Sequence, residues 1–202
     1  MVQQLILIGG TAGTGKTTLA RDLARELDAG WLQLDTVWLA MKAAVNRSSS
    51  AFDLLDVPAA MADPDRSDEE AKAAFVAASE VICRVLPEIL AFELDAKSAL
   101  VADGAWLLPD FVAHLTLPGT DIRSVFLHHV DGAGVAAALE PRLEGRPLLD
   151  RHRVANRRIW QCGEWICEQA RVHGLTVMDC LPFEDLTHRV LESLGSRKTA
   201  DG

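Results

Sequence analysis

The sequence predicts an α/β protein in which helices cover both faces of a five-stranded, doubly wound parallel sheet, giving three layers. Short apolar runs bounded by glycine, aspartate or proline alternate with stretches of helical periodicity, which is the pattern of βαβ units. The first run, Leu5-Ile6-Leu7-Ile8, is apolar throughout, as expected for a strand buried on both faces. With 202 residues, of which 49% are hydrophobic, the chain is long enough for one sizeable core and short for two domains.

Five segments are predicted to form the strands of this sheet. Each is a mostly apolar run that ends near residues typical of turns. In chain order they are Leu5 to Ile8, Trp31 to Leu34, Ser98 to Ala102, Ile122 to His128 and Thr176 to Met178.

Three of the connecting segments have clear helical periodicity. The first begins at a glycine-rich segment and places Leu19, Leu23 and Leu27 along one face. The second runs from about residue 68 to 95, and the third from about residue 152 to 173. These helices are expected to pack on the sheet through their apolar faces.

A single domain is predicted over residues 1–195. The segment 46–67 is rich in serine, aspartate and proline and contains only short apolar clusters, so we expect an excursion that moves. A second mobile segment is expected at 140–151, where prolines and a glycine interrupt a run dense in arginine. The tail 196–202 is predicted to be disordered.

Composition narrows the class of protein. A formal net charge of −9 and a pI near 5.1 argue against a general nucleic-acid binder, and no apolar stretch reaches the roughly 20 residues that span a bilayer. The opening residues lack the features of a signal peptide. The four cysteines form neither a C-x-x-C pair nor a disulfide framework. We therefore expect a reduced cytoplasmic protein with no nucleic-acid or membrane partner.

A glycine-rich motif, Gly10-x-x-x-x-Gly15-Lys16-Thr17, follows the first strand and precedes the first helix. Glycines let successive N–H groups point inward, and the helix N-terminus adds partial positive charge, which together bind phosphate. The strand, loop and helix context favours this interpretation over a glycine-rich turn that merely precedes a helix. The residues predicted to bind the nucleotide are Gly10, Thr11, Ala12, Gly13, Thr14, Gly15, Lys16, Thr17 and Thr18.

The same motif predicts ATP and Mg²⁺ as cofactors. Lys16 is expected to act catalytically by reaching the β- and γ-phosphates, and Thr17 is expected to ligate magnesium.

Acidic residues close two of the predicted strands, at Asp35 and Asp103. Ligands of open α/β sheets bind beyond the carboxyl ends of the strands, so both residues are expected at the site. Asp103 is predicted to hold magnesium, directly or through water. Asp35 is predicted to orient an attacking hydroxyl or accept its proton, and the alternative is an N-cap for a helix that starts at Thr36.

The residue after Asp103 helps to distinguish classes of nucleotide-using protein. Gly104 stands where many hydrolytic motors have a glutamate that activates water, and no Asn-Lys-x-Asp sequence that would recognise guanine is present. The sequence therefore predicts a phosphotransferase whose acceptor is a small metabolite with a hydroxyl or phosphate group. Two alternatives stay open: a nucleotide-dependent switch or ATPase acting on a partner protein, and a nucleoside monophosphate kinase. The oligomeric state is not predicted.

Six arginines gather late in a chain that is otherwise acidic: Arg142, Arg146, Arg151, Arg153, Arg157 and Arg158. A lid that placed guanidinium groups over the γ-phosphate would stabilise transferred charge and exclude water. Arg142, Arg146 and Arg153 are the candidates for a catalytic arginine. The alternative is a solvated helix face whose arginines pair with neighbouring acids.

Two weaker features adjoin these positions. His128 and His129 end the fourth predicted strand, where adjacent side chains point to opposite faces, so we expect one buried and one facing the cleft. Trp38 and Trp106 each follow a candidate aspartate by three residues. They are candidates for lining an acceptor pocket, with core packing an equal alternative.

Together, Gly10 to Thr17, Asp35, Asp103-Gly104 and the late arginines resemble the P-loop small-molecule kinases related to nucleotide and shikimate kinases, over most of the chain. Within that group, Ile8 to Thr17 and Asp103 to Phe111 are similar to segments of 2-phosphoglycerate kinases. The second of those segments has the pattern Glu-Gly-x-His-x-x-Pro-Gly-Phe in that family.

This chain has Asp103, Trp106 and Asp110 where that pattern has glutamate, histidine and glycine. Because these positions belong to the expected acceptor region, the resemblance supports the reaction more than the acceptor. The placement of Asp35 is also similar to that of the aspartate in chloramphenicol phosphotransferase and the zeta-toxin kinases, whose acceptors are different.

The resemblance further implies a strand order of 2-3-1-4-5. It implies a mobile acceptor-binding region at 36–67, a lid at 140–151, and contact with adenine by the turn at 179–182.

Overall fold

The computed structural model describes residues 2–195, apart from the side chain of Arg142. The strands are β1 (Gln3–Gly9), β2 (Gly30–Gln33), β3 (Ala99–Asp103), β4 (Thr120–His128) and β5 (Thr176–Asp179). They form one parallel sheet in the order β2-β3-β1-β4-β5. The predicted fold class and strand order are confirmed.

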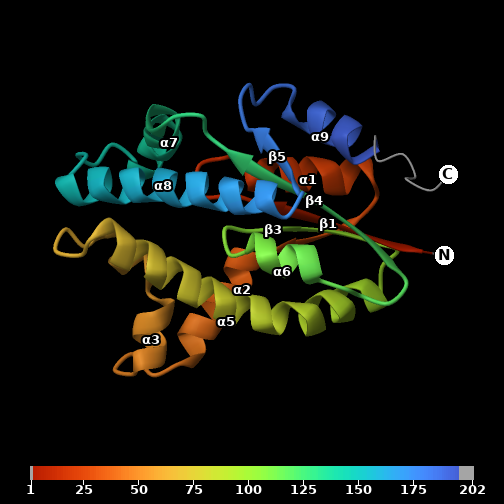
Figure 1. The fold of residues 1–202 in the computed structure, drawn as a ribbon, viewed down its shortest axis with the longest axis horizontal. Coiled ribbons are helices and arrows are strands. Elements are labelled where there is room, and N and C mark those ends of the chain that lie inside the picture. The colour runs from red at the N-terminus through yellow and green to blue at the C-terminus, as the bar shows by residue number, and fades with distance from the viewer. Residues whose placement is uncertain (1, 196–202) are drawn as a thin grey trace.

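Helices occupy most of the connections between strands. They are α1 (Lys16–Glu26), α2 (Leu34–Ala44), α3 (Ser50–Leu55), α4 (Val57–Ala62), α5 (Asp68–Asp95), α6 (Pro109–His114), α7 (Gly132–Leu139), α8 (Asp150–Val172) and α9 (Leu186–Gly195), with a 3-10 helix, η1, at Glu140–Leu143. Figure 1 shows the two longest helices, α5 and α8, lying along the sheet. Within residues 2–195 none of these helices combines the length and apolar character needed to cross a membrane.

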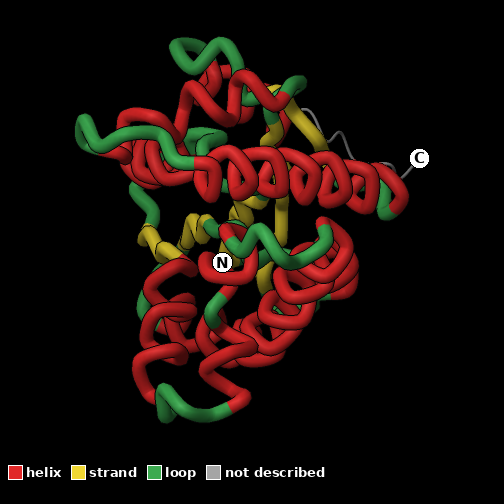
Figure 2. Tube along the Cα trace, turned by 90° about the vertical axis from the view of Figure 1, so that its left-hand side faces the viewer, coloured by secondary structure: helices red, strands yellow, loops and turns green. Residues whose placement is uncertain are grey.

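The sheet is buried between two hydrophobic clusters, because alternate residues of a strand point to opposite faces. Leu5 and Leu7 of β1 pack with α5 and α8 on one face. Ile6 and Ile8 of the same strand pack with α1 and α9 on the other. Figure 2 shows the strands in the middle of the molecule, with helices above and below them. These two clusters account for the continuous apolar run in β1.

The structure corrects the predicted boundary between β2 and α2. The strand ends at Gln33 and the helix begins at Leu34, with Gln33 at the N-cap position. Leu34 is fully buried. It packs so closely on Gly104 that a Cβ added to Gly104 would lie 2.7 Å from the Leu34 Cβ. The chain therefore turns into the helix at once. Asp35 lies in the first turn of α2, neither at a strand end nor at an N-cap.

The segment 46–67 contains two short helices that were not predicted. Ser49 caps α3 by accepting a hydrogen bond from Phe52 N, and Pro58 lies in the first turn of α4, where proline is well tolerated. Ser67 and Glu70 form a capping box that starts α5 at the predicted residue. The movement of 36–67 and of 140–151 stays a prediction, and the tail 196–202 lies outside the described residues.

Candidate active site

The phosphate loop, residues 10–15, joins β1 to α1 in a conformation that depends on glycine. Gly10 and Gly15 have φ values of +123° and +78°, in the left-handed region that L side chains rarely adopt. A Cβ on Gly10 would lie 2.2 Å from the carbonyl oxygen of Leu127 in β4. The first glycine of the motif therefore permits both the turn and the close approach of β4.

Hydrogen bonds across the phosphate loop close it. Thr14 Oγ1 and Lys16 Nζ both donate to the carbonyl oxygen of Thr11, at 3.0 and 2.7 Å. Gly15 is the N-cap of α1, so the first N–H groups of that helix lie at the loop. The predicted nucleotide-binding residues Gly10 to Thr18 thus form one loop and the helix turn that follows it. This is the geometry of an anion site.

His129, the residue directly after β4, supports the phosphate loop. Its Nε2 lies 3.0 Å from the carbonyl oxygen of Gly13, and its Nδ1 lies 3.3 Å from Cys180 Sγ. Burial raises the pKa of the Cys180 thiol to about 12, so the thiol keeps its proton and donates to Nδ1. Because a carbonyl oxygen can only accept, Nε2 bears a proton and donates to Gly13. The expectation of one buried histidine is met by His129, which is 3% exposed.

Asp103 and Thr17 lie together at the end of β3, as predicted. Thr17 Oγ1 donates to Asp103 Oδ2 at 2.9 Å, and Trp31 Nε1 donates to Oδ1 at 2.7 Å. Asp103 is 1% exposed, and this burial raises the pKa of its carboxyl, while the two hydrogen bonds and the charge of Lys16 oppose the rise. Trp31 was not predicted.

These oxygens fit a magnesium ion that is held mainly by a nucleotide. Magnesium is usually bound through one or two protein oxygens, substrate phosphates and water. Thr17 and Asp103 supply such oxygens beside the phosphate loop. In the described part of the chain no group of three or more histidine, cysteine, aspartate or glutamate side chains is arranged to hold a metal.

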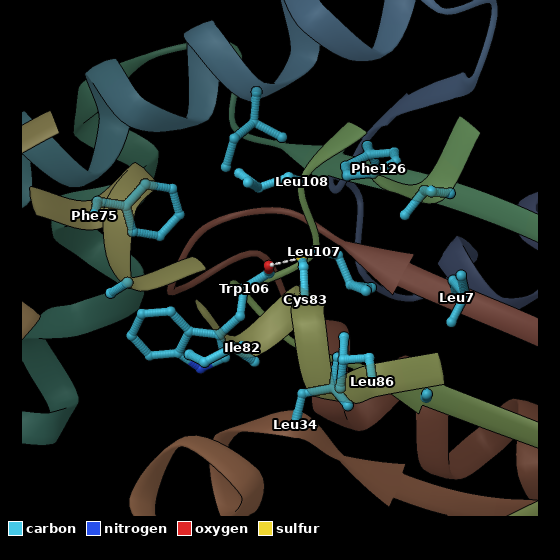
Figure 3. Close-up of a cluster of buried hydrophobic side chains, with 14 of the residues drawn as sticks. Leu7, Leu34, Phe75, Ile82, Cys83, Leu86, Trp106, Leu107, Leu108 and Phe126 are labelled. Atoms are coloured by element: carbon cyan, nitrogen blue, oxygen red, sulfur yellow. Dashed lines mark hydrogen bonds between the residues drawn. The ribbon is translucent and has the colours of Figure 1, made fainter. Parts of the chain in front are cut away.

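Asp35 is held in place by an aromatic cluster. Trp106 Nε1 donates to Asp35 Oδ1 at 2.9 Å. The Trp106 ring stacks on Trp38, with centroids 5.2 Å apart, and on Phe75, with centroids 6.0 Å apart. Figure 3 shows Trp106 beside Phe75, with the Cys83 thiol donating to the Trp106 carbonyl oxygen. Both tryptophans are therefore packed in this cluster, as one of the two alternatives predicted.

A cavity of about 300 Å³ adjoins Asp35, and we call it the aromatic cavity. The phosphate loop forms one of its walls, and the others come from α2, α4, α5, α8 and the residues after β3. It is lined by Thr11, Ala12, Asp35, Trp38, Val57, Pro58, Met61, Phe75, Ala105, Trp106, Ala155, Ile159 and Cys162.

A second cavity of about 310 Å³, the Phe183 cavity, adjoins the other end of the phosphate loop. It is lined by Gly15, Thr18, Leu19, Asp22, Phe183, Leu186 and Thr187. The Phe183 ring lies so close to Gly15 that a Cβ added to Gly15 would be 2.9 Å from the ring atom Cε1. The phosphate loop therefore lies between two cavities of similar size. A larger cavity, of about 740 Å³, lies between α5, α6 and α8 and includes no residue of the loop.

Two of the predicted catalytic arginines, Arg146 and Arg153, bond to residues close to them in the sequence and, within the described part of the chain, not to the phosphate loop. Arg146 Nε donates to the Leu143 carbonyl, and Arg153 Nη1 pairs with Asp150 at 2.7 Å on the exposed side of α8. Arg142 lies in η1, and its side chain is outside the described part of the chain.

Arg158, by contrast, is buried where α8 meets the segment between α4 and α5. Its guanidinium donates to the Asp68 carboxylate and to the backbone carbonyls of Ala60, Met61, Asp63 and Arg66. This arginine joins two elements of the fold and is not available for phosphate.

No protein-family model matches this chain, and no curated protein matches it either. Solved structures match it over nearly its full length. Shikimate kinase from Acinetobacter baumannii, solved with shikimate, has a TM-score of 0.59 at 17% identity, covering 98% of this chain and 96% of that one. A sugar kinase from a Janibacter species has a TM-score of 0.57 at 17% identity, with the same coverage of 98% and 96%.

Shikimate kinase from Bacteroides thetaiotaomicron has a TM-score of 0.50 at 16% identity, covering 96% of this chain and 98% of that one. Identities this low establish the fold alone. At that level the predicted resemblance is confirmed: this chain has the fold of the P-loop small-molecule kinases.

Proposed function

We propose that this chain is a kinase that transfers the γ-phosphate of MgATP to a hydroxyl group of a small molecule. The observation that supports this most directly is the position of the phosphate loop between two cavities, one of which contains Asp35. A donor and an acceptor bound in these cavities would meet at the loop. Phosphoryl transfer depends chiefly on such positioning and on stabilisation of charge.

The donor side consists of the phosphate loop and its neighbours. Backbone N–H groups of the loop and the Lys16 ammonium bind the phosphates. Thr17 and Asp103 hold magnesium, which supplies positive charge to the β- and γ-phosphate oxygens when bound. The Phe183 cavity takes the adenine, which places the base next to the turn at 179–182.

The acceptor side depends on Asp35. Its Oδ1 accepts the hydrogen bond from Trp106, which fixes the direction of the carboxylate. Among the described residues no side chain donates to Oδ2, so this oxygen is available to orient the acceptor hydroxyl and receive its proton. A cavity shaped for a small molecule favours an external acceptor over a switch that acts on a partner protein.

The arginines of the lid retain a proposed role. Arg142, Arg146 and Arg153 lie in or beside the segment 140–151, and its closure would bring guanidinium groups toward the γ-phosphate. Arg146 and Arg153 are exposed and make only local bonds, which a closing movement can exchange at low cost.

Replacement of Asp35 tests this proposal. Asp35→Asn is expected to bind ATP as the unmodified protein does, while transfer falls about a hundredfold or more, because the amide cannot accept the proton. ADP release and product mass would be measured across a panel of nucleoside monophosphates, phosphorylated acids and neutral alcohols. Asp53→Asn, at an exposed residue of α3, is the control.

Equal transfer by Asp35→Asn and the unmodified protein would exclude Asp35 from the catalytic role. Strong ADP release without any acceptor, stimulated by a partner protein, would favour the regulatory switch instead.

A further inference from the structure

The walls of the aromatic cavity are apolar and come from several elements. Val57 and Met61 of α4 face Ile159 of α8, and the stacked rings of Trp38 and Trp106 form another side. Such walls favour a ligand whose own surface is apolar and partly planar, because burial of apolar area and ring stacking both stabilise the complex.

The charge in the wall of this cavity is negative. Asp35 is its only carboxylate, and none of its described lining residues is a lysine, arginine or histidine. Burial raises the pKa of the Cys162 thiol in its wall to about 12, so this group stays neutral. A phosphate or carboxylate on the ligand would lose its water here, meet no cation in the wall and be repelled by Asp35.

Arg158, the buried arginine of α8, bonds to groups outside the lining of the aromatic cavity or to backbone carbonyls of α4 and the residues after it. Arg158 is 2% exposed, and its guanidinium is bonded to Asp68 and to four backbone carbonyls. Moving it into the aromatic cavity would leave those groups unpaired, which is costly in a buried setting. Lys16 begins α1 directly after the phosphate loop, where the donor phosphates need it.

On the basis of the proposed kinase function, we propose that the acceptor is an uncharged alcohol or phenol with a compact, ring-containing apolar body. Its rings lie against Trp38 and Trp106, and its hydroxyl reaches Asp35 beside Thr11 and Ala12. The hydroxyl oxygen forms a bond to the γ-phosphorus while the bond from that phosphorus to the β,γ-bridging oxygen breaks. The hydroxyl proton passes to Asp35, and the products are a neutral-bodied phosphate monoester and ADP.

Matched pairs of ligands test the charge preference. The first pair is 1-phenylethane-1,2-diol and mandelate, which share a phenyl ring and a hydroxyl. The diol is neutral and has a hydroxymethyl group where mandelate has a carboxylate. Benzyl alcohol and benzoate form a second pair with the same difference. Binding to the full chain saturated with MgADP would be followed through the indole N–H signals of Trp38 and Trp106 in NMR spectra. The neutral member of each pair is expected to bind at least about tenfold more tightly.

A charge placed in the wall should reverse this preference. Met61→Lys puts an ammonium into the cavity, so mandelate is expected to gain at least about tenfold in affinity relative to the diol. Ala59→Lys adds the same charge to the exposed side of α4 and should leave the preference as it was. Should Met61→Lys fail to fold, as judged by its melting curve, Ile159→Lys makes the same test from α8.

Tighter binding of the anionic members by the unmodified protein, or no binding of any neutral member, would overturn this inference. Phosphoryl transfer to anionic acceptors that depends on Asp35 would also overturn the inference of a neutral acceptor, but it would leave the proposed kinase function intact. Binding of neutral ligands with no transfer to any of them would instead contradict the kinase function.

Discussion

Gly10 illustrates how a single residue determines the donor site. Its φ of +123° and the 2.2 Å that would separate an added Cβ from the Leu127 oxygen leave no room for a side chain. We predict that Gly10→Ala displaces the phosphate loop and weakens ATP binding at least about tenfold, since several N–H groups would be misdirected. Calorimetric titration with MgATP measures this.

Gly119→Ala is the matched control for that substitution. Gly119 also has a positive φ, of +74°, but an added Cβ would meet nothing within 4 Å. It is expected to lower stability by about 1 kcal/mol through backbone strain and to leave ATP affinity unchanged. Equal losses of affinity in both variants would show that general destabilisation, not the loop, is responsible.

The residues of the site differ in how far sequence alone could predict them. The phosphate loop, Thr17 and Asp103 were predictable because motif spacing and the end of a strand are local properties of the chain. The contacts of Trp31 and His129 were not, since Trp31 reaches the site from β2 and His129 from the residue after β4. Their contacts follow only once the order of the strands and the register between them are known.

Among the elements, α8 is joined to the segment between α4 and α5 by Arg158. We predict that Arg158→Met lowers the free energy of unfolding by about 3 kcal/mol, because it leaves Asp68 and several buried carbonyls without a donor. Arg157→Met removes a bond to the same carboxylate from a side chain that is 54% exposed. Its expected cost is below about 1 kcal/mol. Urea denaturation of both variants gives the comparison.

A similar loss in the two variants would contradict the assignment of Arg158 as the buried connection between these elements.

The same junction predicts a dependence of stability on pH. Hydrogen bonds from Arg157 and Arg158 lower the pKa of Asp68 from 3.8 to about 2 in the folded protein. Between these values the unfolded chain binds more protons, so this contribution is fully present above about pH 4 and is lost as the pH falls toward 2. Asp68→Asn should therefore show a smaller fall in stability over that range.

Denaturation curves at several acidic pH values measure this slope. Asp65→Asn controls for the removal of one negative charge nearby, and a slope unchanged in Asp68→Asn would refute the prediction.

Among the helices and strands, long elements were predicted more accurately than short ones. The helix α5 was placed at about 68–95 because its apolar periodicity is long. The helices α3 and α4 were missed, since six residues make less than two turns and show no repeat. The start of α2 was misplaced because Leu34 continues the apolar run of β2, although its burial belongs to the helix.

For the molecule as a whole, the reactivity of the four buried cysteines measures how completely the core excludes water. Burial raises the pKa of the Cys83 thiol to about 11 and of the other three thiols to about 12. We predict that none reacts with a disulfide reagent at pH 8 in the native state and that all four react in urea, because the thiolate is the reactive form. Rapid labelling of a native thiol would contradict this closed core.

Thr11 and Ala12 belong to the phosphate loop and also line the aromatic cavity. In the proposed reaction the same backbone would contact both ligands, so any shift of the loop on nucleotide binding would also reshape the acceptor's surroundings. Thermodynamic linkage then requires reciprocity: the factor by which nucleotide alters acceptor affinity equals the factor by which acceptor alters nucleotide affinity. Under the proposed function, a wall of two residues shared by the donor and acceptor sites would thus couple the binding of the two substrates, so that neither binds independently of the other.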